Sequence, residues 1–515
     1  MLIDTRELPP NTRIEADLAI IGGGIAGIAL ARQFEQSGID VCILESGGEE
    51  PEKEVQDLYS GSAQMLGPDG TSRNIDEYLT SSRVRFYGGS GNAWGGKCVP
   101  LDPADFRERS WVPDSGWPIT RAALQPFYDR ACDLFDIPHF PADASAHWTA
   151  ERPAVDLGDA GLQSLPRYFT RCTGATAENT FTGFKAGVSD SARTRVYLNA
   201  NVRDIRLRKD GGSVEALEVV TLEGVHHEAR ARCYVLATGG IENARLLLAS
   251  NDVAQAGIGN ANDLVGRFFQ GHVTLGLYEG AGGRNTSFCL SRLDRPFGLY
   301  VDGNRGGAQA VFGPTWEAQQ HARLRNCTLT PFDVWYATHR SSKAIMDLTR
   351  LMDGALEHPT VDAGGLGHFQ FFFMLEQSPN ERSRITLTNE RDSLGMRRVH
   401  LDWDFNESDF AELDRAIAFF RRELGRTGQG RIEWPLLRQE VIDNMSMSRH
   451  HNGSTRMHVS RDRGVVNADC RVHDAGNLYI AGSSVFPTGG IANPTLTLVA
   501  LAMRLSDHLK QELRS

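Results

Sequence analysis

The segment that most constrains the fold lies near the N-terminus, where a strand, a glycine turn, a helix and a second strand follow one another. Residues 16–22 are apolar enough for a buried strand, and residues 22–27 (GGGIAG) then supply the pattern G-x-G-x-x-G. Residues 28–36 continue as a helix that ends at Gly38, and residues 40–45 have the composition of a second strand. This order predicts a βαβ unit whose helix N-terminus receives a pyrophosphate.

Glu45 ends the second strand, roughly 20 residues after the second motif glycine, the usual place for an acid that binds a ribose hydroxyl. A G-x-G-x-x-G pattern alone is weak evidence, but strand, turn, helix, strand and acid together are strong evidence. The βαβ unit therefore predicts a binding site for FAD or NAD. A later buried strand at 234–240 ends in Ala-Thr-Gly-Gly and precedes a helix at 241–250. That arrangement resembles FAD-binding Rossmann proteins and favours FAD.

Bulk composition excludes several classes of protein. A length of 515 residues suggests two or three domains, and a net charge of −11 argues against nucleic-acid binding. No apolar run is long enough to span a membrane, and the acidic first fifteen residues do not form a secretory signal, so we expect a cytoplasmic protein. The eight cysteines include no CxxC motif, which argues against zinc and iron–sulfur sites.

A C-terminal block carries the candidate chemistry. It contains residues 450–457 (HHNGSTRM), an apolar strand within 477–483, and residues 489–497 (GGIANPTLT). Pro494 suits the first turn of a helix that extends to about residue 513, and Asn493 suits its N-cap. A polar amide at the positive end of a helix can hold an electron-rich ring edge. Asn493 as a plain cap, and His450 as an ordinary core or surface histidine, are the simpler alternatives.

The middle of the chain predicts a second domain. We expect one antiparallel sheet that includes an aromatic strand at 368–377 and further strands at 384–387 and 399–403, followed by a helix at 407–426. A helix at 122–135 with Thr120 as its N-cap, and an antiparallel pair at 214–222 and 226–233, are also predicted. Residues 50–82 and 281–345 have polar compositions typical of irregular structure.

Together these segments resemble the glucose–methanol–choline (GMC) oxidoreductase family. The resemblance covers nearly the whole chain and includes the N-terminal unit and residues 88–96, 116–120, 237–248, 450–457 and 477–509. The 450–457 and 492–497 segments are most similar to the branch of pyranose oxidases and sugar dehydrogenases. The resemblance to the family implies an α/β fold (α+β overall) with a discontinuous Rossmann-like FAD-binding domain (1–100, 191–272, 436–515). The substrate domain (101–190, 273–435) would contain the antiparallel sheet and helices.

The resemblance also implies roles for individual residues. His450 matches the catalytic base and Asn493 its His-or-Asn partner, whereas the glycine-rich loop at 88–96 matches the segment beside the flavin ring. Pyranose oxidases often attach FAD through a histidine where this chain has Ala93, so we expect non-covalent FAD and no metal. The residues expected to bind FAD come from seven segments: Gly22, Gly24, Ile25, Ala26, Gly27, Glu45, Ser46, Gly89, Ser90, Asn92, Ala93, Trp94, Gly95, Val202, Ala237, Thr238, Gly239, Gly482, Ser483, Pro494 and Thr495.

The implied reaction is oxidation of a secondary ring hydroxyl of a sugar or glycoside to a ketone. An imidazole can accept the hydroxyl proton near neutral pH, and Asn493 can orient the alcohol. Phe371, Gln377 and His451 are candidate substrate contacts, and oxygen or a separate soluble carrier would accept the electrons. A non-sugar alcohol (a sterol, polyol or aminoglycoside) or a hydroxynitrile-lyase-like protein with structural FAD are the alternatives. A flavoprotein without catalytic activity is disfavoured by the pairing of His450 with Asn493.

Overall fold

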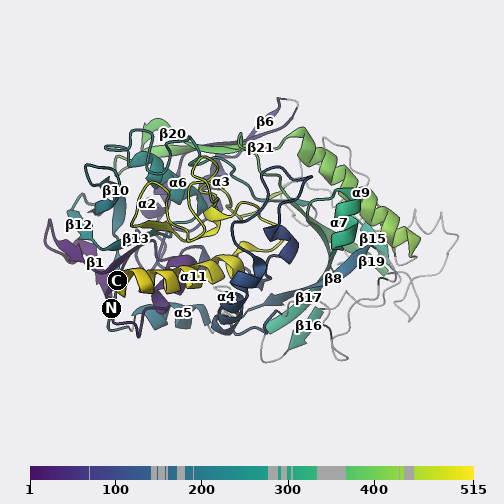
Figure 1. The fold of residues 1–515 in the computed structure, drawn as a ribbon, viewed down its shortest axis with the longest axis horizontal. Helices are drawn as coiled ribbons and strands as arrows, with labels where there is room; N and C mark the ends of the chain where they lie inside the picture. The colour runs from purple at the N-terminus through teal and green to yellow at the C-terminus, as the bar shows by residue number, and fades with distance from the viewer. Residues whose placement is uncertain are drawn as a thin grey trace.

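The computed structural model describes residues 1–68, 70–140, 148, 157, 161–170, 180–189, 191–275, 288–291, 299–302, 306–332, 367–427, 430–433 and 446–514. Figure 1 shows a parallel sheet with its helices at one end of the molecule and a large antiparallel sheet at the other. The predicted α/β class is confirmed. No helix among the described residues is long and apolar enough to cross a membrane.

A six-stranded parallel sheet contains the predicted nucleotide unit. Its strands run in the order β1 (Leu2–Asp4), β9 (Thr194–Leu198), β4 (Val41–Leu44), β3 (Leu18–Ile21), β13 (Cys233–Leu236) and β24 (Leu478–Ile480). The inner strands are buried on both faces, as expected for a parallel sheet covered by helices. Helix α1 (Ile25–Arg32) follows β3 and packs against the long C-terminal helix α11 (Pro494–Arg514). Helix α1 ends before the predicted residue 36, because the chain turns from Gln33 to Gly38.

A small sheet packs beside the parallel one. It contains β10 (Asn201–Leu207), β11 (Val214–Val220), β12 (His226–Arg230) and β2 (Arg13–Glu15), with β11 and β12 antiparallel as predicted. Helix α6 (Gly240–Ala249) follows β13 and confirms the helix predicted there.

The large sheet has ten strands within the described parts of the chain. Its main order is β22 (Gly430–Glu433), β15 (Phe288–Ser291), β19 (Gly367–Glu376), β18 (Cys327–Phe332), β17 (Gly306–Pro314), β8 (Leu162–Phe169) and β7 (Lys97–Cys98). Strand β14 (His272–Leu275) joins β19 to β23 (Ser446–Met447), and β16 (Leu299–Asp302) pairs with β17. The aromatic strand is confirmed as β19. The irregular structure expected at 281–345 is wrong for β15 to β18 and for helix α7 (Trp316–Ala322); residues 333–345 lie outside the described residues.

Two further sequence predictions need correction. Strands β20 (Arg384–Arg391) and β21 (Arg397–Asp404) do not join the sheet of β19, because β21 pairs in parallel with β5 (Ser62–Leu66). The segment 50–82 is therefore structured, and it also holds α2 (Lys53–Gln56), β6 (Ser72–Asn74) and α3 (Asp76–Ser81). Strand β5 alternates partly exposed and buried residues, a period of two that its polar composition concealed.

The predicted helices of the second domain are present. Helix α4 (Arg121–Leu134) begins after Thr120, whose hydroxyl accepts from the backbone N–H of Ala123 at 3.1 Å. Helix α9 (Glu407–Arg426) has the predicted bounds and lies beside the large sheet (Figure 1). Helix α5 (Thr180–Ser189) packs on α1.

Candidate active site

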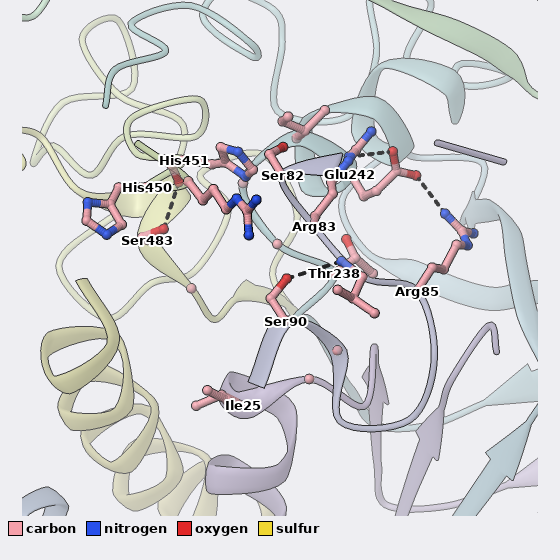
Figure 2. A pocket seen from close by; sticks show the side chains of 18 of the residues that line it. Ile25, Ser82, Arg83, Arg85, Ser90, Thr238, Glu242, His450, His451 and Ser483 are labelled. Carbon is pink, nitrogen blue, oxygen red and sulfur yellow. Dashed lines mark hydrogen bonds and ion pairs between the residues drawn. The ribbon is translucent and has the colours of Figure 1, made fainter. Parts of the chain in front are cut away.

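One cavity of about 1210 Å³ extends from the glycine turn after β3 to the N-terminus of α11. Figure 2 shows its wall, from Ile25 on α1 to His450 and His451. Pockets for drug-sized ligands hold roughly 300–1,000 Å³, so this cavity can accommodate an extended dinucleotide and a small molecule. It is lined by most of the residues that the sequence assigned to FAD: Gly22, Gly24, Ile25, Ala26, Glu45, Ser46, Gly89, Ser90, Ala93, Trp94, Gly95, Val202, Ala237, Thr238, Gly239, Gly482, Ser483, Pro494 and Thr495.

Two of the assigned residues, Gly27 and Asn92, act on the backbone instead of lining the cavity. A Cβ on Gly27 would lie 2.1 Å from the carbonyl oxygen of Gly22, so only glycine allows this approach of helix and turn. The Asn92 amide donates to the carbonyl oxygens of Tyr87 and Gly89 at 3.0 and 3.1 Å. Asn92 thereby fixes the loop that carries Ala93 and Trp94.

The glycine turn is built for close contact with a ligand. Gly22 has a φ of +104°, and a Cβ there would lie 2.7 Å from the carbonyl oxygen of Ala237. The carboxylate of Glu45 accepts from the backbone N–H of Gly23 at 2.7 Å and from that of Gly47 at 3.0 Å. Glu45 therefore fixes the turn and still lines the cavity where a ribose would lie.

The candidate catalytic pair, His450 and Asn493, is brought together from segments 43 residues apart. His450 follows β23, Asn493 precedes α11, and the Asn493 amide nitrogen lies 3.2 Å from His450 Nε2. Asn493 directly precedes Pro494, the first residue of α11, as predicted, and its side-chain amide contacts His450. Its Oδ1 is buried without a partner among the described residues. An orphaned acceptor on the cavity wall is available to a ligand hydroxyl.

A second histidine, which the sequence did not single out, lies behind His450. His272 begins β14 and is 1% exposed. Its Nδ1 lies 2.7 Å from His450 Nδ1, and its Nε2 lies 3.1 Å from the carbonyl oxygen of Gly490. No sequence motif marks His272, because it approaches His450 only through the pairing of β14 with β23.

This chain of contacts determines the tautomers. A carbonyl oxygen only accepts, so the Nε2 of His272 must carry the proton that is donated to Gly490. Neutral His272 then has a bare Nδ1, which accepts from the Nδ1–H of His450. Neutral His450 is left with a bare Nε2 on the cavity side, where the Asn493 amide donates. The geometry therefore presents the basic nitrogen of His450 to the cavity.

Burial keeps these histidines neutral. Burial, and then the neighbouring His272, hold the pKa of His450 well below its usual value. Burial likewise lowers the pKa of His272 to about 4 and that of His451 to about 3. All three are unprotonated at neutral pH, as a proton acceptor at position 450 requires.

A buried ion cluster supports the far end of this chain. The carboxylate of Glu376 accepts from the two terminal nitrogens of Arg109, both at 2.8 Å, and also from the backbone N–H of Gly490 at 3.1 Å. The Asn326 amide also donates to Glu376, at 2.9 Å. The Gly490 peptide is therefore fixed at its N–H by Glu376 and at its carbonyl by His272.

The candidate substrate residues lie in different places. His451 lines the cavity, and its Nε2 lies 3.0 Å from the Tyr78 hydroxyl. Gln377 lies outside the cavity, because its amide is committed to Gly271, Trp403 and Asp404 within the core. Phe371 belongs to β19, but its side chain lies outside the described residues.

The lining of the cavity fits FAD. The glycine turn, the flat loop at 88–96 and the unpartnered Nε1 of Trp94 provide backbone and donors for a dinucleotide and a planar ring. Within the described ranges, no group of three or more His, Cys, Asp or Glu side chains could hold a metal ion.

The sequence is similar to a known family model and to known oxidases and dehydrogenases. Residues 379–502 match the model of the GMC oxidoreductase family. The sequence is 27% identical to 6'''-hydroxyparomomycin C oxidase of Streptomyces lividus, over 95% of this chain and 90% of that protein. It is 25% identical to 2-methyl-1,2-propanediol dehydrogenase of Mycolicibacterium austroafricanum, over 96% of this chain and 95% of that protein. A shorter match, 36% identical over 26% of this chain and 25% of the relative, is with C-glycoside 3-oxidase of Arthrobacter globiformis.

The fold is also that of a solved structure, pyridoxine 4-oxidase from Mesorbium loti, with a TM-score of 0.57 over 96% of this chain and 99% of that one. At 18% identity this likeness concerns the fold alone. The match of residues 379–502 and the full-length relatives together indicate an alcohol oxidase or dehydrogenase that is similar to GMC oxidoreductases, a family for which FAD is the expected cofactor.

Proposed function

We propose that this enzyme oxidises a secondary ring hydroxyl of a sugar or glycoside to a ketone, with His450 as the proton acceptor. The observation that carries the proposal is the hydrogen-bond chain from Gly490 through His272 to His450, which leaves Nε2 bare on the cavity side. The relative named for a C-glycoside supports the sugar class.

In this proposal the alcohol binds between His450 and Asn493. Its hydroxyl proton passes to Nε2 of His450, and the orphaned Oδ1 of Asn493 and its amide N–H orient the oxygen. FAD, when bound, supplies the acceptor for the hydride that leaves the carbon. The substrate is held in a cavity closed by the large sheet, where Thr274 and Met374 contribute to the wall.

FAD is held without a covalent bond in this proposal. Ala93 occupies the loop position at which a linking histidine would stand, and it has no nucleophilic side chain. The glycine turn, Glu45 and the residues at 237–239 would hold the dinucleotide, and the N-terminus of α11 would face the ring. An electron acceptor, oxygen or a separate soluble carrier, completes each turnover.

A non-sugar alcohol is the second candidate, favoured by the full-length similarity to a diol dehydrogenase. The test supplies FAD-loaded protein with methyl glycosides and with 2-methyl-1,2-propanediol, together with an artificial electron acceptor. Borodeuteride trapping followed by mass spectrometry then identifies any new carbonyl group, a ketone on a glycoside or an aldehyde on the diol, and the carbon that was oxidised. A keto-glycoside that is absent with His450→Ala supports the proposal. Oxidation of the diol but of none of the glycosides would replace the sugar class by the diol class.

A further inference from the structure

Arg167 is a buried cation in the wall of the candidate cavity, and it has no acidic partner among the residues that the structure describes. It lies on β8, lines the cavity and is 2% exposed. Its hydrogen bond within the described chain runs from Nη2 to the Thr328 hydroxyl at 3.3 Å, and no described carboxylate lies within ion-pair distance. Burial alone lowers its pKa, to about 10, so the guanidinium stays charged at neutral pH.

Several other buried arginines in this chain are paired with acids. Arg109 binds Glu376 at 2.8 Å, and Arg245 binds Asp392 at 2.7 Å. A buried charge without a counter-ion destabilises the folded protein. A buried charged group without an acidic partner in the wall of a cavity is therefore a candidate for binding a ligand of opposite charge.

Lys97 adds a second positive charge to the same wall. Strand β7 pairs with β8 so that Lys97 lies opposite Phe169, two residues from Arg167. Side chains two residues apart on a strand share a face, so Lys97 and Arg167 project from the same side of the sheet. Both line the cavity, and burial together with Arg167 lowers the pKa of Lys97 to about 8.

This positive wall lies close enough to the catalytic base to act on it. After burial and the two neighbouring histidines, Arg167 and Lys97 are the charges that disfavour protonation of His450. Proton transfer to His450 during oxidation would be opposed by these cations. An anion bound between them would remove that opposition.

We propose that Arg167, with Lys97 beside it, binds an anionic group of the substrate, so that the preferred substrate is an acidic sugar that carries a carboxylate or a phosphate monoester. This inference rests on the proposed function, since it names the class of substrate at the same site. A guanidinium presents parallel N–H donors that match the oxygens of either group. The secondary hydroxyl would lie at His450 while the anion lies at Arg167.

The kinetic test uses matched substrate pairs and FAD-loaded protein. Methyl glucoside is compared with methyl glucuronoside and with methyl glucoside 6-phosphate, and propane-1,2-diol is compared with lactate. Variants Arg167→Gln and Arg167→Lys are compared with Arg193→Gln, which removes an exposed arginine paired with Asp40. We expect the wild type to favour an acid over its neutral partner by about tenfold or more in kcat/KM, through a lower KM. The preference should collapse in Arg167→Gln, return in part in Arg167→Lys and persist in Arg193→Gln.

The outcomes separate this inference from the proposed function. If the glycosides are inert but lactate is preferred over the diol, the sugar class fails and the anion site stands. If neutral glycosides react as well as the acids, the sugar class stands and the anion site fails. An equal loss of kcat/KM for acid and neutral substrates in Arg167→Gln would also overturn the inference. The uronoside and the phosphate distinguish the two anion chemistries.

A stability measurement provides a readout independent of turnover. Because Arg167 is an uncompensated buried charge, Arg167→Met should not lower the melting temperature of the ligand-free enzyme and should raise it by a few degrees. Glucuronate or inorganic phosphate should raise the melting temperature of the wild type and not that of Arg167→Met. A fall of several degrees in Arg167→Met, or equal stabilisation of both proteins by the anions, would contradict the proposed role.

Discussion

His272 contacts both His450, the proposed base, and the Gly490 carbonyl, and two substitutions at this residue separate these contacts. The amide of asparagine can reach the position of Nδ1, and the longer amide of glutamine can reach that of Nε2. His272→Asn therefore keeps an acceptor for the Nδ1–H of His450, whereas His272→Gln keeps the donor to the Gly490 carbonyl and loses that acceptor. We expect the asparagine variant to stay close to the wild type and the glutamine variant to lose flavin reduction rate.

The size of the loss follows from the buried hydrogen bond. A buried donor left without a partner costs about 1–3 kcal/mol, and the bare Nε2 tautomer is disfavoured by that amount. At 1.36 kcal/mol per factor of ten, the reduction rate of His272→Gln should fall about 5- to 150-fold. Anaerobic stopped-flow measurement of flavin absorbance gives this rate directly, without a contribution from reoxidation.

A structural role for His272 would give a different pattern. Melting temperatures should fall by similar amounts in the two variants, since each keeps one of the two hydrogen bonds. If the reduction rates also fall equally, or if His272→Gln reduces flavin at the wild-type rate, the tautomer argument is refuted.

Three other predictions follow from the same structure. The histidines at 272, 450 and 451 have folded pKa values below the unfolded value of roughly 6.5, so on acidification the unfolded chain takes up protons first, and the stability that is present above that pH is lost. His272, with a pKa of about 4, contributes ~3 kcal/mol of this loss. Denaturant titrations from pH 4.5 to 7.5 should therefore show a free energy of unfolding that depends less steeply on pH in His272→Asn than in the wild type. Arg109→Met leaves the Glu376 carboxylate buried without its arginine and should destabilise the protein by about 3–5 kcal/mol. Arg193→Met, at an exposed ion pair, should change stability by under about 1 kcal/mol. Equal effects of the two substitutions in chemical denaturation would contradict a stabilising role for the buried pair of Arg109 and Glu376. Acid precipitation should release the flavin into the supernatant, and yellow colour retained in the pellet would disprove non-covalent binding.

Local patterns in the sequence predicted the elements that short-range physics controls. The glycine turn at 22–27 and helix α9 were predicted because steric limits on glycine neighbours and helix capping act within a few residues. Long-range pairing was not predictable in this way: β21 pairs with β5, more than 300 residues earlier. Nothing in the local sequence around either strand specifies that partner.

The residues of the candidate active site also fall into a group that the sequence could predict and a group that it could not. His450 and Asn493 could be found because they lie in motif segments at the C-terminus. His272, Arg167 and Glu376 could not, because each is an isolated polar residue on a strand of the large sheet. Their positions depend on strand pairing within that sheet: the pairing of β14 with β23 brings His272 to within 2.7 Å of His450, and Arg167 on β8 lies in the cavity wall.

Anaerobic reduction of the bound flavin tests the central claim most directly. The FAD-loaded protein is mixed without oxygen with neutral and acidic glycosides and with simple alcohols, and the absorbance of the oxidised flavin is recorded. The account predicts bleaching by a glycoside in the wild type and its near-complete loss in His450→Ala, with the yellow cofactor still bound. No bleaching by any alcohol, or undiminished bleaching in His450→Ala, would contradict it.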